Sequence, residues 1–226
     1  MYKFKFWQQL SHPSQLIHNL ESSEDQKLKG YLTSVWVIFG FTLLFFIVRN
    51  FWGMNTADLT ALLVNGEGHL YSFARMMSLF GAILAGILFF VFHYYVITYV
   101  IYLLTKIPYR WIQKVQLYTL FFIVLEKTLT IIIFAVAGFS TPFTLFSLAP
   151  AMAYVYYQDY LLFFLNQLTI ATIITVWIQY ILLSNWVERP KVLLIKLILI
   201  QVIFALLVAL YSILPVLTWI EGWLGL

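Results

Sequence analysis

The sequence contains no cysteine and few charged residues. Without cysteine the chain forms no disulfide bond and offers no thiolate ligand for a metal. Charged residues make up 10% of its 226 residues, whereas a typical soluble domain has about 25%. Hydrophobic residues account for 63% and aromatic residues for 19%. This composition excludes an ordinary soluble domain and indicates an integral membrane protein.

Five long apolar segments follow one another along the chain. A helix needs about 20 apolar residues to cross the hydrocarbon core of a bilayer. The second segment carries no formal charge and is long enough to tilt or to extend past the bilayer. We therefore predict an all-α integral membrane protein, a bundle of five transmembrane helices at about residues 31–48, 76–105, 115–136, 160–183 and 192–214.

Basic residues lie mostly on alternate flanks of these segments. Cytoplasmic loops of membrane proteins carry an excess of lysine and arginine. The pattern predicts a cytoplasmic N-terminus and a C-terminus outside, and it accounts for the net charge of +4 without any binding of nucleic acid. The predicted cytoplasmic flanks hold Lys3, Lys5, Lys27, Lys29, Lys106, Arg110, Lys114, Arg189, Lys191 and Lys196.

Two stretches outside the segments have an interfacial character. Residues 1–30 are predicted to form a cytoplasmic amphipathic arm ahead of the membrane domain at 31–226, because aromatic residues such as Phe6 and Trp7 alternate with lysines. The arm is either a plain anchor beside the first span or a docking surface for a partner. Residues 138–159 are rich in proline and tyrosine, which suits a re-entrant or interfacial segment.

Two ionisable residues, Glu126 and Lys127, lie near the middle of the third segment. Charged groups at this depth are costly and are functional candidates by default. Adjacent residues on a helix point about 100° apart, so these two cannot pair well along one face. We expect Glu126 to reach Lys127, His93 or a polar group of the fourth segment, or to be protonated. His93 and Gln201 are the other polar residues at comparable depth.

The fourth segment carries a polar stripe with spacings of three, three, three and four residues. On a continuous helix this spacing places all five side chains on one face, where they form hydrogen bonds between helices. Two interpretations are open: the stripe holds the helices together, or it lines a path for an ion, a proton or a lipid headgroup. The stripe consists of Asn166, Thr169, Thr172, Thr175 and Gln179.

Small residues gather at one level of the second segment. They form two overlapping pairs four residues apart, a pattern that lets the backbone of a neighbouring helix approach closely. We predict that this level is a helix-packing surface, formed by Gly81, Ala82, Ala85 and Gly86.

No constellation of catalytic or metal-binding residues is visible. The four histidines are spread along the chain, with none of the spacings of a zinc protease, and no Gly-x-Ser-x-Gly elbow lies near a span end. We predict a protein that is not an enzyme and that binds no metal or cofactor.

The layout resembles the Yip (Ypt/Rab-interacting protein) membrane-domain family in its bacterial form. The resemblance rests on the aromatic pair Phe6-Trp7, on His12-Pro13 followed by Leu16 and Leu20, and on five spans. A further part is the basic and polar stretch Lys114-Val115-Gln116-Leu117-Tyr118. It implies a five-span helical bundle without catalytic residues. Bacterial members are similar to accessory proteins that accompany ABC exporters in envelope-stress or toxin resistance.

Two functions follow as hypotheses. The first is a non-enzymatic accessory protein of the plasma membrane, a bacterial cytoplasmic membrane, that binds or organises other integral membrane proteins such as an ABC transporter. The alternative is a small transporter, channel or lipid-moving protein that uses the mid-membrane polar residues. In both cases the bilayer is the surrounding medium and nucleic acid is not a partner.

Overall fold

The long apolar runs of the sequence become long helices. The structure, a computed structural model, describes residues 30–54, 56, 59–139, 141–156 and 158–214. The predicted N-terminal arm, apart from Gly30, lies outside this range. Across the described residues the regular structure is helical, with one isolated bridge between Ser147 and Thr169. The helices are α3 (Tyr31–Phe51), α4 (Thr60–Val64), α5 (Gly68–Val91), the π-helix η2 (Phe92–Val96), α6 (Ile97–Thr105), α7 (Tyr109–Ala137), α8 (Ala149–Met152), α9 (Asp159–Leu165), α10 (Ile170–Leu183), the 3-10 helix η3 (Ser184–Trp186) and α11 (Pro190–Ile213).

Four helices are long and apolar enough to cross a membrane. They are α3, the continuous helix made by α5, η2 and α6, then α7 and α11, with 21, 38, 29 and 24 residues. They coincide with the predicted first, second, third and fifth segments. Their outer faces expose many large apolar side chains, as the surface of a lipid-embedded bundle does. The chain thus has the architecture of a multi-pass membrane protein.

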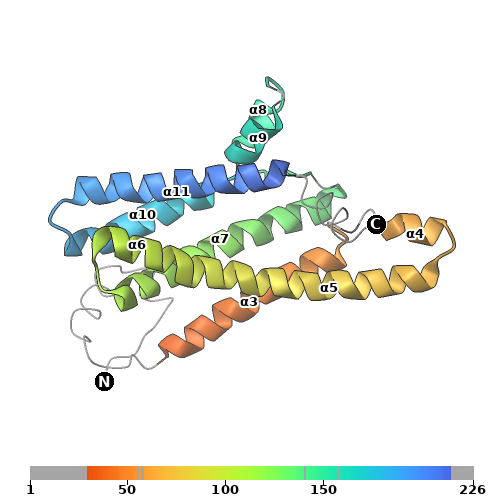
Figure 1. Ribbon diagram of the computed structural model, residues 1–226, viewed down its shortest axis with the longest axis horizontal. Helices are drawn as coiled ribbons and strands as arrows, with labels where there is room; N and C mark the ends of the chain where they lie inside the picture. The colour runs from red at the N-terminus through yellow and green to blue at the C-terminus, as the bar shows by residue number, and fades with distance from the viewer. Residues whose placement is uncertain (1–29, 55, 57–58, 140, 157, 215–226) are drawn as a thin grey trace.

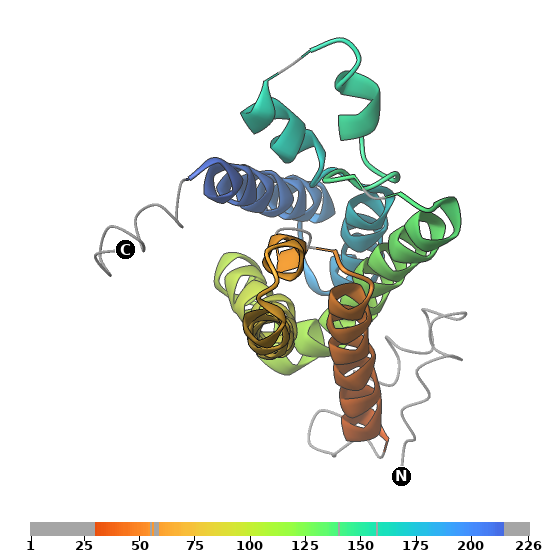
Figure 2. The ribbon, with the colours of Figure 1, turned by 90° about the vertical axis from the view of Figure 1, so that its right-hand side faces the viewer.

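The long helices lie side by side along the longest dimension of the molecule (Figure 1). α3 packs against α5 and α7, while α10 packs against α7 and α11. Viewed along the bundle, α8 and α9 project from its side (Figure 2). We call the end where α6 meets α7 the basic end, because Lys106 and Arg110 lie there, and the opposite end the far end.

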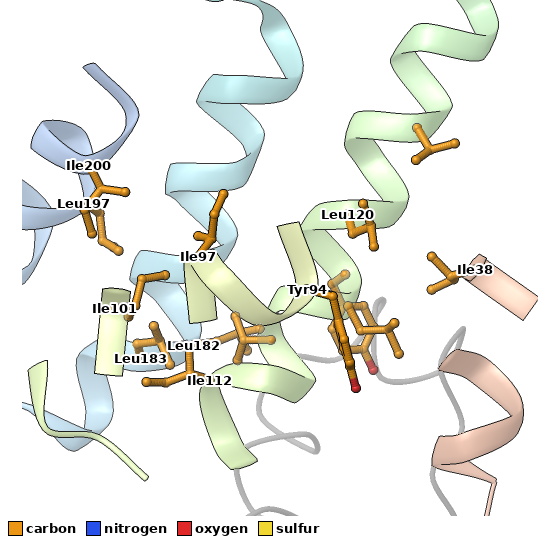
Figure 3. Close-up of a cluster of buried hydrophobic side chains, with 14 of the residues drawn as sticks. Ile38, Tyr94, Ile97, Ile101, Ile112, Leu120, Leu182, Leu183, Leu197 and Ile200 are labelled. Carbon is orange, nitrogen blue, oxygen red and sulfur yellow. The ribbon is translucent and has the colours of Figure 1, made fainter. Parts of the chain in front are cut away.

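The tightest packing lies in the half of the bundle nearer the basic end. Ile101 of α6, Ile112 and Leu120 of α7, Leu183 of α10 and Leu197 of α11 are at most 1% exposed. Figure 3 shows Ile101, Ile112 and Leu183 close together, with Leu120 farther along α7, toward Ile38 of α3. In a membrane such close packing, rather than transfer from water, stabilises helix contacts. It fixes α7 and α10 against each other, and the polar groups discussed below depend on that contact.

The predicted continuous helix at 160–183 is wrong. The chain forms α9 up to Leu165, leaves the helix over residues 166–169, and starts α10 at Ile170. Asn166 and Thr169 explain the interruption, because short polar side chains bond to nearby main-chain groups and favour helix ends. With 14 residues, α10 is about 21 Å long, shorter than the hydrocarbon core.

The small-residue surface of α5 divides into two parts. Gly86 is buried, and a Cβ atom placed on it would come within 3.0 Å of Leu43 and 3.3 Å of Phe46 on α3. This part of the packing prediction is confirmed. Gly81 and Ala85 instead lie exposed, and a Cβ atom on Gly81 would meet nothing within 4 Å. Ala82 is half-buried between the two.

Candidate functional site

The start of α10 is the most unusual polar region of the described structure. A helix leaves its first N–H groups without partners of its own, and inside a membrane each needs an acceptor. At α10 all of them have one. The amide of Thr169 donates to the Thr172 hydroxyl, that of Ile170 to the carbonyl of Phe146, that of Ala171 to the carboxyl of Glu126, and that of Thr172 to the Thr169 hydroxyl.

Thr169 and Thr172 form a capping box at this helix start. The hydroxyl of each accepts a hydrogen bond from the main-chain amide of the other, at 3.3 and 3.5 Å. The three-residue spacing that predicted a polar stripe is also the spacing of a capping box. These two residues therefore serve the helix end and do not face a neighbouring helix.

A loop from the far end folds back to meet this helix start. The hydroxyl of Thr144 lies 3.0 Å from that of Thr130, which is seven residues, or about 10 Å, from the end of α7. Asn166 holds the same loop, because its Oδ1 atom accepts from the Thr144 amide at 2.8 Å and from the Ser147 hydroxyl at 3.2 Å. The loop at 141–148 thus folds back against α7 and the start of α10, while the prediction of a re-entrant or interfacial segment stays a prediction.

Glu126 connects α7 to the helix start. Its Oε2 atom accepts the Ala171 amide at 2.5 Å, about 16 Å from the far end of α7. A carboxyl at a helix N-terminus also interacts favourably with the helix dipole. The expectation that Glu126 finds a partner in the fourth segment is confirmed, and that partner is a main-chain amide.

Lys127 and His93 belong to a different contact. The Lys127 ammonium group lies 5.9 Å from the centre of the Phe89 ring, within the range of a cation–π interaction. His93 lies in the π-helix, with its ring 4.1 Å from the same Phe89 ring and its Nδ1 atom 3.0 Å from the Phe89 carbonyl. Among the described residues no ion pair joins Glu126 to either side chain. The neighbouring residues on α7 thus point to different helices, as the 100° argument predicts.

The remaining stripe residues, Thr175 and Gln179, face α7 and are 1% exposed. The Nε2 atom of Gln179 donates to Oε1 of Gln116 at 2.9 Å, and Gln116 is also 1% exposed. Gln116 is not among the site residues predicted from the sequence. Its signal was an amide within the apolar stretch from Val115 to Leu120, but its partner is 63 residues away.

Gln201 does not join the predicted cluster. It lies half-buried on α11 and makes no hydrogen bond within the part of the chain that the structure describes. The nine predicted polar residues therefore separate into three contacts and one isolated side chain. The contacts are the α10 start with Asn166 and Glu126, the Phe89 group with His93 and Lys127, and the buried amide pair with Thr175.

The described residues contain no group of three or more histidine, aspartate or glutamate side chains that could hold a metal ion. The polar atoms at membrane depth mostly bond to main-chain groups or to one another. This arrangement can hold helices together and satisfy a helix end inside the membrane. No protein-family model, curated protein or solved structure matches the chain.

Proposed function

We propose that the protein is a non-enzymatic accessory protein of the plasma membrane that binds or organises other integral membrane proteins. Its N-terminus is cytoplasmic and its C-terminus outside, with α10 and its re-entrant loop forming the fourth of five passages. The distribution of basic residues supports this topology. The Yip-like layout favours an ABC-type exporter of a bacterial cytoplasmic membrane, in envelope-stress or toxin resistance, as the partner.

The exposed pair Gly81 and Ala85 carries this proposal. The overlapping pair formed by Ala82 and Gly86 packs inside the chain through the contact of Gly86 with α3. Gly81 and Ala85 present the same small-residue pattern on the outer surface of α5. Because such pairs allow two helices to approach closely in a membrane, this surface suits a transmembrane helix of another protein.

The use of the polar groups supports the same view. Glu126, Asn166, Thr169 and Thr172 are occupied in closing the start of α10 and in holding its loop. Residues engaged in this way stabilise the fold and are poor candidates for groups that must repeatedly bind and release a substrate.

Affinity capture from native cells in mild detergent tests the proposal. We expect the wild-type protein to recover an ABC-type permease and its ATPase, and Gly81→Leu to lose most of that recovery because the leucine blocks close helix approach. Gly40→Leu is the matched control: Gly40 also has open space around it, but Trp36 and Leu44 stand four residues away, so it forms no small-residue pair. Recovery of the protein alone, or equal recovery with Gly81→Leu, contradicts the proposal.

The interrupted fourth segment favours one second candidate, a small transporter, channel or lipid-moving protein. Transporters often place a binding site where a membrane helix is broken, and here Glu126 lies at the break. Purified protein in liposomes discriminates the two functions. Flux of protons, ions or labelled lipid that is lost in Glu126→Gln supports transport, whereas its absence supports the accessory function.

A further inference from the structure

Within the part of the chain that the structure describes, three polar atoms between α7 and α10 are buried and have no hydrogen-bond partner. They are Nε2 of Gln116, Oγ1 of Thr175 and Oε1 of Gln179. The two amides share a single hydrogen bond, which uses one polar atom of each side chain. Thr175 and Gln179 are four residues apart on α10, so they lie on the same face of that helix. Unpaired polar groups are costly in an apolar interior, so this concentration of three requires an explanation.

Thr175 differs from the other buried or half-buried threonines of the long helices. Thr42, Thr98, Thr105, Thr128 and Thr130 each donate their hydroxyl to the carbonyl four residues earlier, and Thr119 donates to the carbonyl three residues earlier. That bond satisfies a threonine within its own helix. Thr175 is 1% exposed yet makes no such bond. Its hydroxyl is therefore available to a group outside its own helix.

The donor and acceptor roles of these three atoms indicate which kind of ligand they can bind. Nε2 is a donor, Oε1 is an acceptor, and the hydroxyl is both. Exchanging the oxygen and nitrogen of both amides leaves the same set, so the conclusion does not depend on amide orientation. A cation prefers acceptors alone and an anion prefers donors alone. The set matches a small neutral molecule that both donates and accepts.

We propose that Gln116, Thr175 and Gln179 form a binding site for a single water molecule inside the membrane domain. The water accepts from Nε2 of Gln116, donates to Oε1 of Gln179 and bonds to the Thr175 hydroxyl. Three partners are typical of a buried water. All three side chains are 1% exposed, so the proposed site lies in the interior of the bundle. Thr175 lies about one helical turn from Ala171, whose amide meets Glu126.

The water site is tested by magnetisation transfer from water to side-chain amides in the full-length protein, labelled with ¹⁵N-glutamine and held in detergent micelles. We expect transfer to the side-chain amides of Gln116 and Gln179 in the wild type and loss of at least half of that signal in Thr175→Val. Thr98→Val is the matched control, because its hydroxyl is equally buried but bonds to the Tyr94 carbonyl. That variant should keep the full signal.

Thr175→Ser tests whether the signal is lost because the hydroxyl is missing or because a substitution at this position disturbs the fold. Serine keeps the hydroxyl and should retain the signal. Absence of transfer in the folded wild-type protein overturns the proposal. So does a high-resolution density map in which the two amides form a reciprocal pair of hydrogen bonds and Thr175 donates to the Ala171 carbonyl.

Discussion

Replacing Glu126 with leucine is expected to lower the free energy of unfolding by about 2–3 kcal/mol. The substitution leaves the main-chain amide of Ala171 without an acceptor inside the bundle, where water does not replace it. Leucine and glutamate are similar in size, so the packing of α7 should change little. Among the described residues Glu126 has no ion pair to lose, and the effect should therefore report the helix-start bond.

Glu126→Gln is the matched control. Its side-chain oxygen can still accept the Ala171 amide, and we expect a loss of about 1 kcal/mol or less because a neutral acceptor forms a weaker bond. Unfolding by SDS in mixed micelles, followed by circular dichroism, measures both variants. Equal losses for leucine and glutamine would assign the effect to charge, and no loss in either would contradict the role of Glu126 at the start of α10.

Replacing Gly86 with leucine is expected to disrupt the contact between α3 and α5. A Cβ atom there already comes within 3.0 Å of Leu43 and 3.3 Å of Phe46, so a larger side chain forces the helices apart. Overpacking of this kind costs about 1–3 kcal/mol, and more where the backbone must move. We expect a lower melting temperature in detergent and faster proteolysis between α3 and α5.

Gly81→Leu separates this packing effect from helix propensity. It makes the same change on the same helix at a position with nothing within 4 Å, so its stability should equal or slightly exceed that of the wild type. Equal destabilisation by the two leucines would show that the α3–α5 contact is not where the structure places it.

The four long helices were predictable because each must be apolar over a length that crosses the hydrocarbon core. A helix in hydrocarbon needs a long apolar run, and such runs are visible in the sequence around Ile38, Phe90, Leu120 and Leu197. The different directions of Glu126 and Lys127, about 100° apart, were predictable from helix geometry alone. The burial of Gly86 and the exposure of Gly81 were not, because both residues fit the same small-residue pattern and only the position of α3 distinguishes them.

The interruption of the fourth segment was not predicted because a three-residue spacing of polar residues is compatible with two structures. Residues three apart share a helix face, but three residues also separate the members of a capping box, as Thr169 and Thr172 do. The other two amides at this helix start, those of Ile170 and Ala171, find their acceptors on Phe146 and Glu126, far from α10 in the sequence. For the same reason the pairing of Gln116 with Gln179 depends on tertiary contact rather than on local pattern.

The central feature of the molecule is the loop at 141–148, which folds back to meet α7 and the start of α10. Cysteine crosslinking tests it directly, because the natural chain has no cysteine. In the variant with Thr130→Cys and Thr144→Cys, the hydroxyl positions 3.0 Å apart become sulfur atoms able to form a disulfide.

Two control pairs calibrate the crosslinking measurement. Asn50→Cys with Ser78→Cys is a positive control, since those side chains hydrogen-bond at 2.7 Å. Thr130→Cys with Gly81→Cys is a negative control, since a side chain at Gly81 meets no neighbour. We predict that mild oxidation in native membranes crosslinks the 130–144 pair as completely as the positive control. Crosslinking no faster than the negative control would contradict the folding of this loop against α7.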